Sequence, residues 1–243
     1  MDDWKLQPAQ DLGLPPGERA RSLRRESGLV ETCTHLLWRR LVYTYLRVYH
    51  RLRVEHPERL PAEPPFVLVA NHTSHLDALV LAAPLSRRLA DRVFPIAAGD
   101  VFFETTPMAI FAASMINALP MWRKSCGPHA LKQLRERLVG EPCGYILFPE
   151  GGRSRDGQIK TFKAGLGMIV AGTSVPVVPC YLEGCLAALH PESMWPRLGT
   201  RITLRIGQPM TFADQPDDRE GWQEVTRRLQ AAVTGLGRGG EGS

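Results

Sequence analysis

The sequence predicts an α/β protein with a single layered domain, in which helices flank a mostly parallel central sheet. Short uncharged runs of apolar and β-branched residues recur along the chain, as is typical of strands buried on both faces. Amphipathic helical patterns alternate with these runs, and no internal repeat is present. The chain has 243 residues, of which 44% are hydrophobic and 23% charged, so it can bury a sizeable core. We expect the folded domain to span residues 60–234.

The N-terminal part of the chain changes character at residue 29. Residues 1–28 contain prolines and mixed charges without an apolar segment, which predicts a loosely ordered arm. Residues 29–54 predict a long amphipathic helix. One half of its wheel is apolar and holds Val30, Leu37, Trp38, Leu41, Val42, Tyr45, Val48, Tyr49 and Leu52. The other half holds Arg39, Arg40, Arg47 and Arg51. This sorting suits a helix lying in a membrane interface with arginines at lipid phosphates, and it also suits a core-packing helix with a solvated back.

The elements of the domain follow in order. We expect strands at 66–70, 92–98, 144–148 and 175–182, and a half-exposed edge strand at 201–206, where apolar and polar residues alternate. Helices are expected from Leu76, over 128–140 with Pro128 at its start and Gly140 at its end, over 162–171 and over 219–233. Residues 235–243 predict a flexible tail. The apolar run 107–122 is too short and too interrupted to cross a bilayer, so we expect a buried or interfacial helix there.

A histidine and an aspartate lie where the strand 66–70 gives way to a helix. His72 and Asp77 are five residues apart, about 140° on a helix, so they meet only if His72 precedes the helix and Asp77 is in its first turn. The carboxylate then fixes the ring through Nδ1 and leaves Nε2 as a base. Two other interpretations stay open on this pattern alone. Ser74-x-x-Asp77 is also a capping-box spacing, and His72, His75 and Asp77 are possible metal ligands.

A second polar cluster follows the strand 144–148. Its sequence, from Pro149 to Gly157, sets an acidic residue and two arginines around Gly151 and Gly152. The glycines permit positive φ angles or a close backbone approach, and such a loop suits an anion.

These two clusters together resemble the glycerolphosphate acyltransferase family, which includes the lysophosphatidic acid acyltransferases. The family's Asn-His-x4-Asp block is matched by Asn71, His72 and Asp77, and its second block by Phe148, Pro149, Glu150, Gly151, Arg153 and Ser154. Two weaker blocks fall in the same order, at 119–123 and 175–179. One departure is Gly152, where the family most often has threonine.

The resemblance implies a function and assigns roles to residues. A fatty acyl group would pass from an acyl thioester, either acyl-CoA or acyl-carrier protein, to the hydroxyl of a lysophospholipid, most simply 1-acylglycerol-3-phosphate. His72 would be the base and Asp77 would orient it, with no serine nucleophile. The acceptor-binding residues carried over from the family are Arg123, Glu150, Gly151, Arg153 and Lys163. We expect Glu150 to pair with an arginine or take a hydroxyl, since a carboxylate repels phosphate. No cofactor or metal is implied.

Charge and cysteine content indicate the kind of partner and the location of the protein in the cell. The net charge of +5 and pI near 9.1 suit an anionic partner, for which we expect a membrane surface with anionic lipid rather than nucleic acid. Five cysteines without a paired spacing predict reduced thiols. We expect a peripheral or monotopic protein at the cytoplasmic face of the membrane, with no signal peptide. Alternatives are transfer to another lyso-lipid, an esterase or thioesterase that uses water, and a non-catalytic lipid-binding protein.

Overall fold

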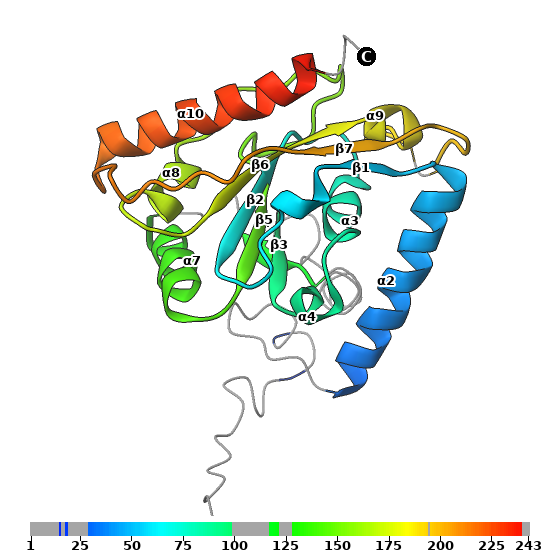
Figure 1. Cartoon of the computed structure of the whole chain (residues 1–243), viewed down its shortest axis with the longest axis horizontal. Coiled ribbons are helices and arrows are strands. Elements are labelled where there is room, and N and C mark those ends of the chain that lie inside the picture. The colour runs from blue at the N-terminus through cyan, green and yellow to red at the C-terminus, as the bar shows by residue number, and fades with distance from the viewer. Residues whose placement is uncertain are drawn as a thin grey trace, which may run out of the picture.

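The computed structural model describes residues 29–98, 117–121, 128–193 and 195–239, together with Pro15 and Glu18. Seven strands form one sheet in the order β1-β7-β6-β2-β5-β3-β4 (Figure 1). The strands are β1 Arg53–Glu55, β2 Phe66–Ala70, β3 Val93–Ala98, β4 Leu119–Met121, β5 Gly144–Leu147, β6 Val177–Glu183 and β7 Thr203–Ile206. The helices are α2 Leu29–Tyr49, α3 Asp77–Ala82, α4 Arg87–Ala90, α7 Pro128–Gly140, α8 Gly165–Val170, α9 Cys185–Ala188 and α10 Arg219–Arg238, with a short 3-10 helix at Pro57–Arg59.

The expected mostly parallel sheet is confirmed. The central strand β2 runs parallel to both of its neighbours, β5 and β6, and only the β6–β7 pair is antiparallel. Parallel neighbours bring their carboxyl ends to the same edge of a sheet. The segments that follow β2 and β5 therefore meet, and these are the segments that carry the two polar clusters.

Helices cover both faces of the sheet because β2 is apolar on both sides. Val67 and Val69 point into one core, which α7, α8 and α10 cover, whereas Phe66 and Leu68 point into the other, which α2, α3 and α9 cover. All five residues of β2 are buried. This strand is therefore the rigid base of whatever its carboxyl end presents.

The end of the first long helix differs from the expected one. α2 ends at Tyr49, Arg51 takes a left-handed backbone conformation with φ of 46°, and Arg53–Glu55 then forms β1. Because β1 pairs with β7 in parallel, the prediction that 201–206 is an edge strand is wrong. The alternation in that segment instead reflects Arg205, whose guanidinium forms ion pairs with Glu55 and Glu183 across the three strands.

The expected apolar face of α2 is divided between the core and the surface. Leu46 is fully buried and Val42 and Tyr45 pack against the same core, but Leu37, Leu41 and Val48 are exposed. The predicted arginine face is divided as well. The Arg39 side chain donates from Nη2 to the carbonyl oxygens of Ala82, at 3.2 Å, and Leu85, at 2.8 Å, at the end of α3. Burial lowers the pKa of Arg39, against a smaller opposing effect of Asp91.

The last helix, α10, is longer than expected. The helix expected over 162–171 is present as α8 and is shorter than expected. α10 continues through Gly235 to Arg238, so part of the expected tail is helical. Gly237 allows this, since a Cβ there would lie 2.8 Å from the ring of Tyr181. α8 begins only at Gly165, because the residues from 158 to 163 form no regular structure and the Lys163 amide bonds the Pro149 carbonyl at 2.9 Å. The arm before residue 29 and most of the 107–122 run lie outside the described residues.

Candidate active site

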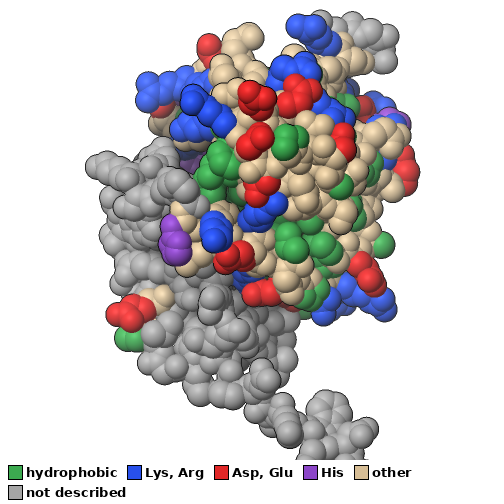
Figure 2. Space-filling view, turned by 90° about the vertical axis from the view of Figure 1, so that its left-hand side faces the viewer, with side chains coloured by type: hydrophobic (Ala, Val, Ile, Leu, Met, Phe, Trp, Pro, Cys, Tyr) green, Lys and Arg blue, Asp and Glu red, His purple; other side chains and the backbone are tan. Residues whose placement is uncertain are grey.

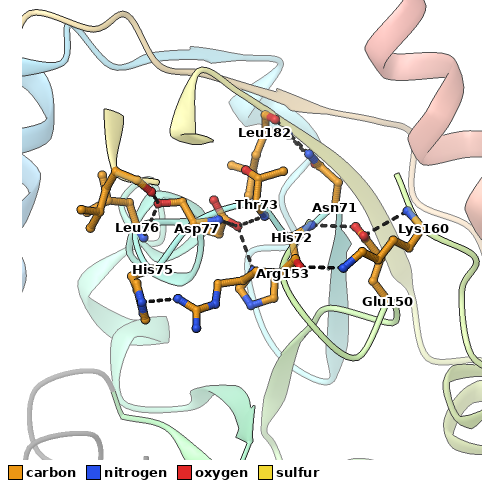
Figure 3. A network of polar contacts seen from close by, with 12 residues as sticks. Asn71, His72, Thr73, His75, Leu76, Asp77, Glu150, Arg153, Lys160 and Leu182 are labelled. Carbon is orange, nitrogen blue, oxygen red and sulfur yellow. Dashed lines mark hydrogen bonds and ion pairs between the residues drawn. The ribbon is translucent and has the colours of Figure 1, made fainter. Parts of the chain in front are cut away.

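The His72–Asp77 pair forms at the carboxyl end of β2. His72 lies in the loop after the strand and Asp77 is the first residue of α3, as the spacing predicts. Nδ1 of the His72 ring is 2.8 Å from Oδ2 of Asp77 (Figure 3). The Asp77 carboxylate has no exposed surface, whereas the His72 side chain keeps 21% of its surface exposed. With Nδ1 engaged, Nε2 is the ring nitrogen that can accept a proton from outside.

The same carboxylate oxygen also organises the loop. Oδ2 of Asp77 accepts the backbone N–H groups of Thr73, at 2.6 Å, and Ser74, at 2.8 Å. The Ser74 contact resembles the reach-back contact of a capping box, but the helix begins at Asp77 with Leu76 as its N-cap and no side-chain cap, so the capping box itself does not form. The other oxygen, Oδ1, is buried without an N–H or O–H donor among the described residues. The thiol of Cys185 lies beside this carboxylate, where burial and then the charge of Asp77 raise the thiol pKa.

Two further residues fix the position of His72. The Asn71 side chain continues the sheet beyond β2, since its amide donates to the Leu182 carbonyl at 3.0 Å and accepts the Leu182 N–H at 2.8 Å. The His72 ring stacks on Phe148, with centroids 4.2 Å apart and the planes 18° from parallel. The imidazole is thus held by a carboxylate at one edge and an aromatic ring on one face.

Glu150 joins the two polar clusters through backbone groups. Its Oε1 accepts the His72 N–H at 2.7 Å and its Oε2 accepts the Lys160 N–H at 3.0 Å. A third contact, from the Ser154 N–H to the His72 carbonyl oxygen at 2.7 Å, closes the junction. The Glu150 side chain is buried, and this burial raises its pKa against the two amide contacts, which lower it. Each carboxylate oxygen therefore already has a partner within the protein.

Basic groups gather on the loop after Glu150. The Arg153 guanidinium bonds Nε2 of His75, and the Arg153 carbonyl accepts a hydrogen bond from Lys160 Nζ at 2.6 Å (Figure 3). Burial, and then the Arg153 charge, lower the pKa of His75, which keeps its ring neutral as an acceptor. The Lys163 side chain lies across Gly151, where a Cβ would come within 2.5 Å of the Lys163 Nζ. Gly151 has a φ of +72°, so its conformation favours glycine, and a Cβ there would also displace the end of the Lys163 side chain.

The two serines near His72 are occupied by structural contacts. Ser74 Oγ donates to the Leu189 carbonyl at 2.7 Å and accepts the Leu76 N–H at 3.2 Å. Ser154 Oγ donates to Asp156 Oδ1 at 2.6 Å, and both serine residues are fully buried. The arrangement offers a base without an adjacent serine nucleophile at these two positions.

The structure brings together most of the residues that the sequence singled out. His72, Asp77, Glu150, Gly151 and Arg153 share one network with Lys160, and Lys163 packs on Gly151. Arg123 lies outside the described residues. The three candidate metal ligands do not converge, because His75 bonds Arg153 instead of joining the His72–Asp77 pair. Within the ranges that the structure describes, no group of three or more His, Cys, Asp or Glu side chains is placed to hold a metal ion.

Comparisons with known proteins identify the family of the chain. The sequence profile of the family described as acyltransferase matches residues 51–183, which hold every described site residue. Over 139 residues the chain is 34% identical to the chloroplastic 1-acyl-sn-glycerol-3-phosphate acyltransferase BAT2 of Brassica napus, covering 56% of this chain and 38% of that protein. It is 30% identical to human 1-acyl-sn-glycerol-3-phosphate acyltransferase beta over 171 residues, covering 68% and 60%.

A solved structure has the same fold. The chain matches the 1-acyl-sn-glycerophosphate acyltransferase PlsC of Thermotoga maritima with a TM-score of 0.62 at 22% identity, over 86% of this chain and 79% of that one. The chain spans less than two thirds of the length of these plant and human relatives. The family profile nevertheless covers more than half of the chain, from β1 to the end of β6. The chain therefore belongs to the acyltransferase family.

Proposed function

We propose that this protein transfers a fatty acyl group from an acyl thioester to the free hydroxyl of a lysophospholipid, with 1-acylglycerol-3-phosphate as acceptor and phosphatidic acid as product. The observation that carries the proposal is the contact between the buried carboxylate of Asp77 and Nδ1 of His72, at 2.8 Å. The loop that holds His72 is joined to the cluster of basic groups that follows Glu150. The names of the plant and human relatives support the same acceptor.

The proposed chemistry is a single transfer step. Nε2 of His72 takes the proton of the acceptor hydroxyl as its oxygen attacks the thioester carbonyl, and the thiolate of the donor leaves and takes up that proton. Asp77 stabilises the imidazolium that forms between these events. A thioester is already activated, so positioning and proton transfer suffice. The engaged hydroxyls of Ser74 and Ser154 support direct transfer over a serine-bound acyl intermediate.

The acceptor phosphate is assigned to the basic loop. Arg153 and Lys163 supply positive charge beside His72, and Gly151 keeps the backbone accessible there. Arg123 is proposed as a further phosphate ligand on the family pattern alone. Glu150 belongs to the same loop, but its two amide contacts support a positioning role instead of direct contact with the acceptor.

The proposed setting is the surface of a membrane that contains anionic lipid, on its cytoplasmic face. α2 carries no acidic residue between Thr32 and Tyr49, and Leu37, Leu41 and Val48 form an exposed apolar row beside Arg40 and Arg47. Such a row suits a helix that lies in the headgroup region. Among the described helices, none combines the length and the apolar character that a membrane crossing requires.

The test is product analysis with a panel of donors and acceptors. Purified protein is incubated with acyl-CoA or acyl-carrier protein and with lysophosphatidic acid or other lyso-lipids in detergent micelles, and the lipids are identified by mass spectrometry. We expect phosphatidic acid from lysophosphatidic acid. Release of free fatty acid without an acceptor would instead indicate a thioesterase, and no turnover with any pair would remove the enzyme proposal.

A further inference from the structure

Exposed apolar side chains are concentrated on one part of the molecule. Eight large hydrophobic side chains are exposed in the described ranges, and five of them belong to α2: Leu37, Leu41, Tyr43, Val48 and Tyr49. Two more, Trp195 at 81% exposure and Leu198 at 61%, lie in one short loop, and only Val139 on α7 lies elsewhere. Figure 2 looks at the side of the molecule away from α2, where acidic, basic and hydrophobic side chains are interspersed. Single exposed apolar residues are ordinary, but this grouping is not.

The loop 195–198 is attached to the end of α2. The Gly199 N–H bonds the Tyr49 carbonyl at 3.0 Å, and the Ile202 N–H bonds the His50 carbonyl at 3.0 Å. The His50 ring is fully buried between the Thr200 carbonyl, 3.3 Å from Nδ1, and the Tyr45 hydroxyl, 2.9 Å from Nε2. The exposed residues of the loop therefore continue the exposed row of α2 as one surface.

The backbone of the loop is held while its large side chains point outward. The Arg197 N–H bonds the Ala188 carbonyl at 2.7 Å, and Ser193 Oγ donates to the Trp195 carbonyl at 2.9 Å. A tryptophan fixed at 81% exposure in an ordered loop leaves apolar area in water that another surface could cover. Indole rings are enriched at the level of lipid headgroups, where one edge is apolar and the N–H is wet.

The charge around this surface selects an anionic occupant. Four exposed arginines surround it: Arg47, Arg51, Arg197 and Arg201. The nearest acidic residue in the loop, Glu192, is already paired with Arg155 at 3.3 Å. Arginines beside tryptophan and leucine fit a bilayer with anionic headgroups, because the cations meet phosphate while the apolar side chains enter the interface.

We propose that residues 195–198 form a second membrane-insertion element, which seats the protein on an anionic bilayer together with α2. The proposal rests on the proposed function, which requires a lipid acceptor. It also gives the site an orientation, since the Arg197 N–H ties this loop to the Ala188 carbonyl, and the neighbouring Leu189 carbonyl accepts the hydrogen bond from Ser74 Oγ beside His72. α2 and the loop lie on the two sides of His50, which contacts both Tyr45 and Thr200. Two such contact elements fix the tilt of the protein relative to the bilayer, whereas one helix alone leaves this tilt free.

The test is vesicle binding by the full chain. One set of vesicles contains phosphatidylcholine alone, and the other contains phosphatidylcholine with about 30 mol% phosphatidylglycerol. We expect the double change Trp195→Ala with Leu198→Ala to weaken binding to the anionic vesicles by about tenfold. Val139→Ala removes an apolar side chain that is 59% exposed on α7, outside this surface, and should leave binding unchanged. The chain has five tryptophans, one of them Trp38 in α2, so the fluorescence blue shift on vesicle addition should be smaller in Trp195→Phe than in the wild type.

The outcomes separate this proposal from the enzymatic one. Unchanged vesicle binding in the double variant, or a blue shift as large in Trp195→Phe as in the wild type, would overturn the second contact whatever the activity. A wild-type protein that makes no phosphatidic acid but loses vesicle binding in the double variant would sustain the contact and remove only the enzyme proposal. Oligomers in solution that the double variant abolishes, with vesicle binding unaffected, would assign this surface to a second copy of the chain and refute membrane insertion.

Discussion

Replacing Glu150 by glutamine should separate catalysis from acceptor binding. The side chain keeps its length, but one of its two oxygens becomes an NH2 group. Either the His72 N–H or the Lys160 N–H then faces a donor instead of an acceptor. Losing a hydrogen bond to a buried charged group costs about 1.5–3 kcal/mol. Glutamine carries no charge, so it avoids the cost of burying a carboxylate, the cost that raises the Glu150 pKa. This gain offsets part of the lost hydrogen bond, and we expect a net loss of about 1–3 kcal/mol in the free energy of unfolding.

The catalytic effect follows from the place of the lost bond. The His72 N–H is fixed by Glu150 at 2.7 Å, directly at the residue whose ring is the proposed base. A misplacement of about 1 Å can cost a factor of about 100, so kcat for acyl transfer should fall about 10- to 100-fold. The KM for lysophosphatidic acid should change less than about threefold, since both carboxylate oxygens are occupied within the protein.

The assay is initial-rate acyl transfer with the acceptor varied, alongside a thermal melt. A loss of 1–3 kcal/mol in a chain of this size lowers Tm by about 2–12 °C. Glu136→Gln removes the same charge from an exposed ion pair with Lys132, 3.9 Å long, and should alter neither quantity noticeably. A large rise in acceptor KM with kcat unchanged would refute the positioning role and make Glu150 a substrate ligand.

Three further predictions concern the loop, its charge and pH. Arg153→Ala should raise the acceptor KM more than it lowers kcat, as steady-state kinetics will report, because a remote phosphate contact acts about equally on bound substrate and transition state; a loss confined to kcat would contradict this. Gly151→Ala should lower both Tm in a thermal melt and the rate of acyl transfer, because φ is +72° and the new Cβ would lie 2.5 Å from Lys163 Nζ. Gly152→Thr should leave both quantities nearly unchanged, because a Cβ there meets nothing within 4 Å. Burial lowers the pKa of His50 from 6.5, so unfolding free energy should drop as pH falls from about 6.5 through the folded pKa, and His50→Gln should flatten that part of the urea-midpoint profile.

Local patterns in the sequence were sufficient to predict the centre of the fold and the contact between His72 and Asp77. The strand β2 is an uninterrupted apolar run, and the five-residue spacing from His72 to Asp77 permits contact only at a strand-to-helix turn. The capping and orienting interpretations of Asp77 competed in the sequence. The structure forms the orienting contact, while the helix begins at Asp77 itself without a side-chain cap, and the spacing alone could not decide between the two.

Contacts to backbone groups and distant segments could not be predicted. Glu150 binds two amides, which have no signature in the residue letters, and Cys185 reaches Asp77 only because β6 lies beside β2. The wheel of α2 predicted one apolar face and one arginine face, but in the folded chain Arg39 bonds the end of α3 while Leu37 and Leu41 are exposed. The sequence predicted helix as far as Val54, which includes the first two residues of β1, because the pairing of β1 with β7 forms only in the folded sheet.

The most direct measurement is kcat for acyl transfer from acyl-CoA to lysophosphatidic acid in wild type and His72→Ala, with folding checked by the thermal melt. The account predicts phosphatidic acid from wild type and a fall of about 100- to 10,000-fold in the variant, the usual contribution of a general base. Equal kcat in a folded His72→Ala protein would contradict the proposal that this histidine, held 2.8 Å from Asp77, performs the proton transfer.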